Sequence, residues 1–225
     1  MCQPASFVVT KTAVFYGSKS ESHEDIIEEH GLENLDREIN LGLVHVEITP
    51  PGGNFAAPLE QWQYQVDQDL LPEWYNAADV EDRVRAKLPK WASEKIVLAN
   101  QIVEKANGHI IAVYGTVQKV LDGGTVQEVW GGGTVQEVWG GGTVQKVLDG
   151  GTVQKVWGDG TVQKVLDGGT VQKVLGGGTV QEVWGGGTVQ SYTESITKGI
   201  LHGRNAVLID RSGERVVCYI GEDEE

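Results

Sequence analysis

A nine-residue repeat fills the middle of the sequence and constrains the fold more than any other feature. Eight full units of the pattern T-V-Q-(K/E)-V-(L/W)-(D/G)-(G/D)-G run from residue 116 to residue 187 without a slip. The first six residues of a unit favour a short strand, and the glycines that follow permit a sharp turn. One such strand cannot bury a face alone, whereas stacked strands pair each backbone with the coils above and below. The repeat therefore predicts an all-β solenoid, a parallel β-helix of strand–turn repeats.

The number of repeats in one coil stays open. A single repeat is too short to enclose a core, so a coil holds two repeats or three. A three-repeat coil, which the sequence variation favours slightly, would align like residues in columns: Leu121, Leu148 and Leu175; Trp130, Trp157 and Trp184; Lys119, Lys146 and Lys173. A two-repeat coil would instead stack Lys119, Glu137 and Lys155 with alternating sign, which is electrostatically better.

The sequence also leaves undecided which side chains face the interior of the solenoid. Position 4 is Lys or Glu and must face water. Strict alternation would then turn Thr, Gln and the second Val inward, with Gln and Thr ladders inside and a Val/Trp/Leu strip outside. The alternative buries both valines and requires a bulge between them. Exposed apolar strips often mark contacts, so the tryptophans of the repeat are the candidate binding residues: Trp130, Trp139, Trp157 and Trp184.

The residues before the repeat predict a compact α+β domain. Alternating, β-branched stretches indicate strands over 6–16, 43–49, 60–67 and 109–114.

Two segments of this domain have helical patterns. Residues 20–30 predict a helix that Ser20 or Ser22 caps and Gly31 ends. A longer pattern begins at Asn76 and continues toward residue 108, and Pro89 is expected to kink or divide it.

These patterns divide the chain into three parts. Residues 1–112 form an α+β capping domain, residues 113–190 the solenoid, and residues 191–225 closing strands followed by an acidic tail.

Composition restricts the partners. The net charge is −14, and residues 1–114 contribute most of it, with 18 Asp and Glu against 9 Lys and Arg. This acidity argues against direct nucleic-acid binding, which needs Lys and Arg.

No apolar stretch approaches the length of a membrane span, and no signal peptide is evident. Cys2 and Cys218 have no metal-binding spacing, so we expect a reduced, cytoplasmic protein without membrane contact.

No cofactor or metal is expected. The unit GGTVQKVLD, read from Gly123, resembles the calcium-binding nonapeptide GGxGxDxUx of repeats-in-toxin proteins. The third Gly and the central Asp of that pattern are Val and Lys in this chain, so the ligands for calcium are missing.

The segment DQDLLPEWY (67–75) holds the densest group of candidate catalytic residues. Asp67 and Asp69 share a face if the segment is extended, and paired carboxylates can perform acid–base chemistry. His23 in the 20–30 helix is the third candidate. The alternative is a loop in which the aspartates cap turns, and His23 belongs to a solvated acidic helix.

Several short segments together resemble a family of uncharacterised proteins of actinobacteria, their phages and mobile elements. These segments are SHEDII (22–27), VEITPP (46–51), DQDLLPEWY (67–75), DRVRAKLPKW (82–91) and AVLIDRSG (206–213). The resemblance implies an N-terminal domain, short tandem repeats and a closing IDRSG segment. Many relatives use eight-residue repeats where this chain uses nine, and the resemblance transfers no catalytic residue.

The leading functional hypothesis is a non-enzymatic scaffold, associated with a phage or mobile element, that uses the repeat surface for protein interaction or self-association. One alternative is an enzyme or toxin-like activity in the N-terminal domain. Another is an acidic decoy that blocks a host nucleic-acid-binding protein, although the nearly neutral repeat region weighs against it.

Overall fold

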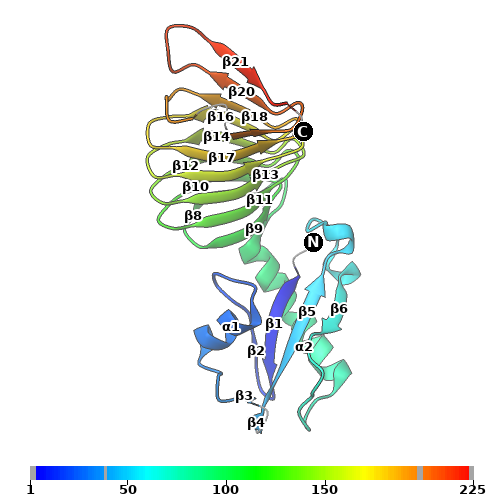
Figure 1. Cartoon of the computed structure of the whole chain (residues 1–225). Coiled ribbons are helices and arrows are strands. Elements are labelled where there is room, and N and C mark those ends of the chain that lie inside the picture. Colours follow the sequence, from blue (N-terminus) through cyan, green and yellow to red (C-terminus); the bar gives the residue numbers. More distant parts are fainter. Residues whose placement is uncertain (1–3, 38–39, 197–199, 223–225) are drawn as a thin grey trace. The chain divides into compact units, whose positions relative to one another are not determined.

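The chain forms two compact units. The computed structural model describes residues 4–37, 40–196 and 200–222. The units are Met1–Glu94 and Lys95–Glu225, and Figure 1 labels their elements. The boundary lies at 94/95 rather than at the 112/113 expected from the sequence, because residues 96–113 already form strands of the solenoid.

The N-terminal unit contains a four-stranded antiparallel sheet of order β2-β1-β5-β6. Its strands are β1 (Ala5–Thr10), β2 (Val14–Phe15), β5 (Leu43–Thr49) and β6 (Gln63–Val66). Further short elements are β3 (Asp36–Arg37), β4 (Asn40–Leu41) and the 3-10 turns η1 (Pro51–Gly53) and η2 (Leu59–Gln61). The strand predicted over 43–49 is confirmed.

Two of the strand predictions were too long. The single strand predicted over 6–16 is a hairpin, because the Thr10 backbone N–H donates to the Ala13 carbonyl at 2.9 Å. The strand predicted over 60–67 begins only at Gln63, since η2 occupies the residues before it.

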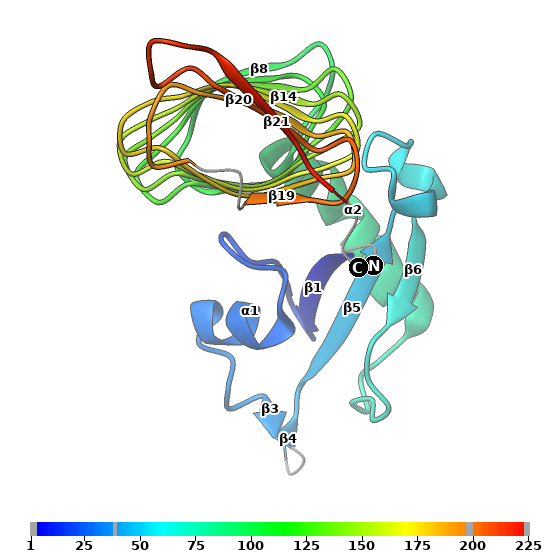
Figure 2. The same ribbon diagram turned by 45° about the horizontal axis from the view of Figure 1, so that its top comes forward.

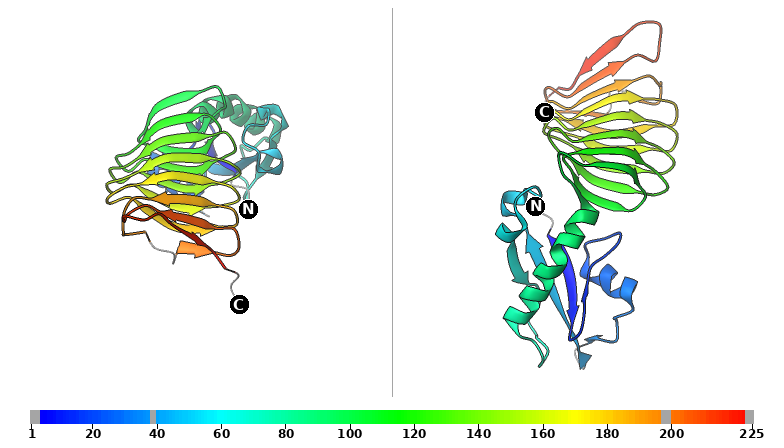
Figure 3. Two further views of the ribbon diagram at one scale, coloured as in Figure 1. Left: turned by 90° about the horizontal axis from the view of Figure 1, so that it is seen from above. Right: turned by 180° about the vertical axis from the view of Figure 1, so that it is seen from behind.

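The two helices cover opposite faces of β1. α1 (His23–His30) begins after the cap Ser22 and ends at Gly31, whose φ of 64° is left-handed. α2 (Ala77–Lys95) continues through Pro89, so of the two expected effects of this proline, a kink or a division, the division is wrong. Every residue of β1 is buried, because Phe7 contacts Trp91 of α2 while Val8 packs with Ile26 and Ile27 of α1. Figure 3 shows α2 against this sheet.

The second unit is a solenoid of about six turns with two facing sheets (Figure 2). The eight-stranded sheet contains β8 (Ile102–Ala106), β10 (Thr116–Val120), β12 (Thr134–Val138), β14 (Thr152–Val156), β16 (Thr170–Val174), β18 (Thr188–Ser191), β20 (Val207–Asp210) and β21 (Val217–Ile220). The seven-stranded sheet contains β7 (Ile96–Val97), β9 (His109–Val113), β11 (Thr125–Val129), β13 (Thr143–Val147), β15 (Thr161–Val165), β17 (Thr179–Trp184) and β19 (Leu201–His202).

Each coil of the repeat region contains two repeats. Thr116 pairs with Thr134 and Lys119 with Glu137 in parallel register, so each strand lies beside the strand two repeats further along the chain. The three-repeat alternative is therefore wrong, and so are its columns: Leu121 and Leu148, for example, follow strands of different sheets. The predicted neighbours Lys119, Glu137 and Lys155 are confirmed.

Both valines of each repeat face the core. The valines at positions 2 and 5, such as Val144 and Val147, are 0% exposed. Thr at position 1, Gln at position 3 and the charged residue at position 4 are mostly half-buried or exposed. The arrangement with Gln and Thr inside is wrong, because two buried valines per strand remove more apolar surface without leaving polar groups to be satisfied. The solenoid core is therefore a stack of valines.

Glycines at positions 8 and 9 close seven of the eight turns, each for a different reason, whereas the unit 152–160 has Asp159 at position 8 and its positive φ at Gly158. At position 8, Gly141 has φ of 77°, which L-residues with side chains rarely adopt. At position 9, a Cβ on Gly142 would lie 2.2 Å from the Val120 carbonyl oxygen of the preceding coil. Gly141 therefore supplies a left-handed backbone conformation, and Gly142 leaves room for the backbone of the preceding coil.

Residues outside the repeat build both ends of the solenoid. β8 pairs with β10 and β9 with β11 in parallel, so the helical pattern predicted beyond Lys95 is wrong. β20 continues the eight-stranded sheet in parallel, and β21 returns antiparallel to it. The end of the predicted acidic tail, residues 223–225, lies outside the described residues.

Candidate binding surfaces

Figure 2 shows the flattened outline of the coil. Position 6 of the repeat forms two columns, one at each edge where a strand ends. Because alternate repeats lie in different sheets, the residue after each strand falls at alternate edges. The first edge carries Leu121, Trp139, Trp157, Leu175 and Tyr192, each bonded through its N–H to the coil before it. The second edge carries Tyr114, Trp130, Leu148, Leu166, Trp184 and His202. The four predicted tryptophans therefore belong to two surfaces rather than one strip.

Trp139 and Trp157 stack on each other in adjacent coils. Their ring centroids are 5.1 Å apart and the planes differ by 18°. The Lys155 ammonium lies 5.0 Å from the Trp157 ring centroid, within the range of a cation–π contact. Both indoles are half-buried, so the pair presents a firmly held aromatic surface with a positive charge beside it.

Trp130 and Trp184 lie apart on the other edge. Trp130 stacks on Tyr114 at 6.3 Å, and Trp184, which is 37% exposed, stacks on His202 at 4.5 Å. Each indole N–H donates to a glutamate two residues earlier in the chain. Two leucines separate these tryptophans, so each stacks on a residue from outside the repeat and the two indoles do not stack on each other.

Charged residues at position 4 form a column on the outer face of each sheet. Ion pairs between neighbouring coils link Lys146 to Glu128 at 2.9 Å, Lys164 to Glu182 at 2.9 Å and Lys155 to Glu137 at 3.5 Å. These opposite charges stabilise the stacking at the coils they link, although Lys146 also lies beside Lys164 in the register of the sheet. A groove of about 520 Å³ follows the eight-stranded sheet between this column and its glutamines, and its lining residues are Gln118, Lys119, Gln136, Glu137, Gln154, Lys155, Gln172 and Lys173.

In the N-terminal unit, the structure brings two of the three candidate catalytic residues together. His23 Nδ1 lies 3.5 Å from Asp67 Oδ2, and its Nε2 lies 3.3 Å from the Val46 carbonyl oxygen. Both ring nitrogens therefore face oxygen atoms of the protein. His23 is buried, which corrects the expectation of a solvated helix position. The third candidate, Asp69, is exposed.

His45 completes this cluster and was not predicted from the sequence. Its ring stacks on that of His23 with centroids 4.6 Å apart. Burial, followed by the charge on His23, lowers the pKa of His45, while Asp36 and Asp67 act in the opposite direction. The alternation of LVHVEIT placed His45 on a strand, but nothing in the sequence showed that α1 lies against it.

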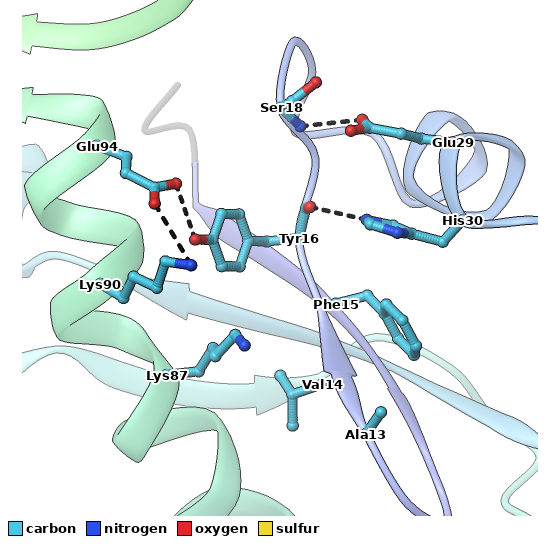
Figure 4. A pocket seen from close by; sticks show the side chains of 10 residues that line it. All are labelled: Ala13, Val14, Phe15, Tyr16, Ser18, Glu29, His30, Lys87, Lys90 and Glu94. Atoms are coloured by element: carbon cyan, nitrogen blue, oxygen red, sulfur yellow. Dashed lines mark hydrogen bonds and ion pairs between the residues drawn. The ribbon is translucent and has the colours of Figure 1, made fainter.

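A pocket of about 430 Å³ opens on another side of the N-terminal unit, between β2, α1 and α2 (Figure 4). The Tyr16 hydroxyl donates to Glu94 at 2.8 Å, and the His30 ring contacts the Tyr16 carbonyl oxygen at 3.2 Å. Burial and then the bond to Glu94 raise the pKa of Tyr16 to about 12. A phenol of such high pKa stays protonated at neutral pH, so it is suited to hydrogen bonding rather than to base catalysis.

Among the described residues, no group of three or more His, Cys, Asp or Glu could hold a metal ion. Within the same part of the chain, no helix combines the length and apolar character that a membrane crossing needs. No family model, curated protein or solved structure matches the chain. The resemblance to the phage-associated family therefore stays a prediction.

Proposed function

We propose that the protein is a non-enzymatic scaffold whose solenoid binds a protein or carbohydrate partner through the edge that carries Trp139 and Trp157. The observation that carries this proposal is the Trp139–Trp157 stack. Its rings are held in place by neighbouring coils, so little side-chain entropy is lost when a partner covers them. The outer faces of the sheets carry Gln, Thr, Lys and Glu, so apolar contact area concentrates at the edges.

The alternatives gain less support. For an enzyme in the N-terminal unit, a catalytic His23 would need a ring nitrogen that is free to meet substrate, whereas both contact protein oxygens. For a nucleic-acid mimic, carboxylates should follow one another along a face, whereas position 4 carries lysines next to glutamates. We also propose that the protein is associated with a phage or mobile element, and this proposal is supported only by the sequence resemblance.

The repeat itself supplies matched variants for a test. Leu occupies position 6 in four of the eight units, so Trp139→Leu/Trp157→Leu preserves the coil while removing the stacked rings. The control is Trp130→Leu/Trp184→Leu, which makes the same change at the other edge. All three proteins would be screened against an immobilised peptide library and a glycan array. We expect the first double variant to lose at least about tenfold in affinity for any ligand found, because aromatic anchors dominate such contacts.

Two outcomes would contradict the proposal. One is that neither library contains a ligand for the unmodified protein. The other is that the Trp139→Leu/Trp157→Leu protein binds its ligand as tightly as the control double variant.

A further inference from the structure

The last strand of the solenoid presents an apolar open edge. β21 is the end strand of the eight-stranded sheet. Val216, Val217 and Ile220 are 59%, 40% and 65% exposed, and the free Cys218 between them is also exposed. Edge strands of this kind pair readily with another strand unless charges or prolines protect them.

The backbone of β21 is oriented for such pairing. The Gly221 N–H donates to the Ala206 carbonyl at 2.8 Å, toward the interior of the sheet. Because hydrogen-bonding groups alternate in direction along a strand, those of Cys218 and Ile220 point toward the open edge. A strand placed there would find both donors and acceptors.

We infer that a second copy of this chain pairs with β21, antiparallel, about a two-fold axis that passes beside Cys218. Two-fold symmetry places residues of the same sheet face opposite each other. In this register Cys218 faces the partner's Cys218, Val216 faces the partner's Ile220, and Val217 faces the partner's Tyr219. All five facing positions from 216 to 220 are then apolar on both strands.

The neighbouring registers fit less well. Moving the axis to Tyr219 places Val216 opposite the partner's Glu222, and moving it to Val217 places Ile220 opposite the partner's Glu214. Each shift therefore buries an apolar residue against a carboxylate. This self-complementarity is the argument for a second copy rather than an unrelated strand.

The preferred register also limits the strength of the dimer. It brings the bend that holds Glu214 near the partner's Glu222 at both ends of the pairing, and like charges close together are destabilising. Added salt screens this repulsion, so the dimer tightens as salt rises. The inference goes beyond the proposed function, because it uses none of the tryptophans and does not depend on them.

Sedimentation equilibrium of the full chain tests the dimer, at concentrations up to about 200 μM because small interfaces bind weakly. We expect a reversible dimer that Ile220→Lys weakens more than about tenfold, since each new charge faces an apolar residue of the partner. Val216→Lys is the second variant. Ile102→Lys is the matched control, because Ile102 is 70% exposed on β8 at the opposite end of the same sheet. Circular dichroism would confirm that each variant is folded.

Disulfide formation tests the register. In a Cys2→Ser background, mild oxidation should link Cys218 to its copy, because facing Cα atoms about 5.5 Å apart permit a disulfide. A protein that stays monomeric at every concentration and salt would overturn the inference. So would equal weakening by Ile102→Lys and Ile220→Lys, or a dimer that forms no disulfide through Cys218.

Discussion

The two units of this protein are stabilised in contrasting ways. The core of the N-terminal unit combines different large side chains, and Trp91 there contacts both Phe7 and Trp62. The core of the solenoid repeats one side chain, Val, at two positions of every strand from β10 to β17. In the first unit each contact is particular to its residues, whereas in the second each coil makes the same contacts with the coil before and after it.

This contrast predicts how far the effect of a mutation extends in each unit. A small core of interlocked side chains unfolds as a whole, whereas a solenoid behaves as a row of units coupled only to their neighbours. A defect in the N-terminal unit should therefore affect that entire unit, and a defect in the solenoid should remain within a few coils.

The largest effect is expected from Trp91→Ala. Trp91 is 0% exposed, and truncation of a buried Trp costs about 3–5 kcal/mol. Hydrogen exchange followed by mass spectrometry should show protection lost across β1, β5 and α2 while β10–β18 keep theirs. An equal loss of protection in the solenoid would break the comparison.

A pair of adjacent glycines should show a smaller effect that is local to the solenoid. Gly142→Ala forces a Cβ against the Val120 carbonyl, and we expect a cost of about 2–3 kcal/mol, as for an overpacked core. Gly141→Ala meets no atom closer than 3.9 Å and only imposes a positive φ, at a cost of about 1–2 kcal/mol. Urea unfolding would rank the two variants, and the reverse order would show that the coils are not packed as described.

The smallest effect concerns pH and one end of the solenoid. Burial, followed by the charge on Lys95, lowers the pKa of His109 to about 4 from an ordinary value of 6.5. The folded state therefore binds this proton less readily than the unfolded state. The contribution of neutral His109 is fully present above about pH 6.5 and is lost as pH falls toward 4.

His109→Gln removes this titration. Exchange protection of β9 and β11 should decline between pH 6.5 and 4 in the unmodified protein, and that part of the decline should be missing in the variant. His45→Gln, in the N-terminal unit, serves as the comparison variant and should leave the decline in β9 unchanged. Identical pH profiles for the unmodified and His109→Gln proteins would contradict the assignment.

The sequence predicted regular features better than exceptions to them. The period of nine predicted the solenoid, and the choice of Ser20 or Ser22 as cap, with Gly31 as the end, predicted α1 to within two residues, because both signals depend on local conformation. The first coil was missed because IVEKA lacks the Thr and Gln of the repeat. It does keep Val103, Lys105 and Ala106 at positions 2, 4 and 5, and that spacing is the signal that would have identified it.

The contacts within the candidate sites depend on how segments distant in the sequence pack together, which the sequence patterns did not predict. All four tryptophans have the same place in the repeat, yet only the coil length decides that Trp139 meets Trp157 while Trp130 lies at the other edge. Likewise, the contact of His23 with Asp67 depends on how α1 lies against β5 and β6. The variation pattern that suggested three repeats per coil was misleading, because surface positions record the history of duplication as well as packing.

The most direct test of the two-repeat coil uses engineered cysteine pairs in a Cys2→Ser/Cys218→Ser background. Lys119→Cys/Glu137→Cys places thiols on paired residues of neighbouring strands, about 4.8 Å apart at the backbone, a spacing that permits a disulfide. Lys119→Cys/Lys146→Cys places them three repeats apart, on different sheets. We expect rapid intramolecular disulfide formation in the first pair and none in the second, whereas a disulfide in the second pair and none in the first would exclude a coil of two repeats.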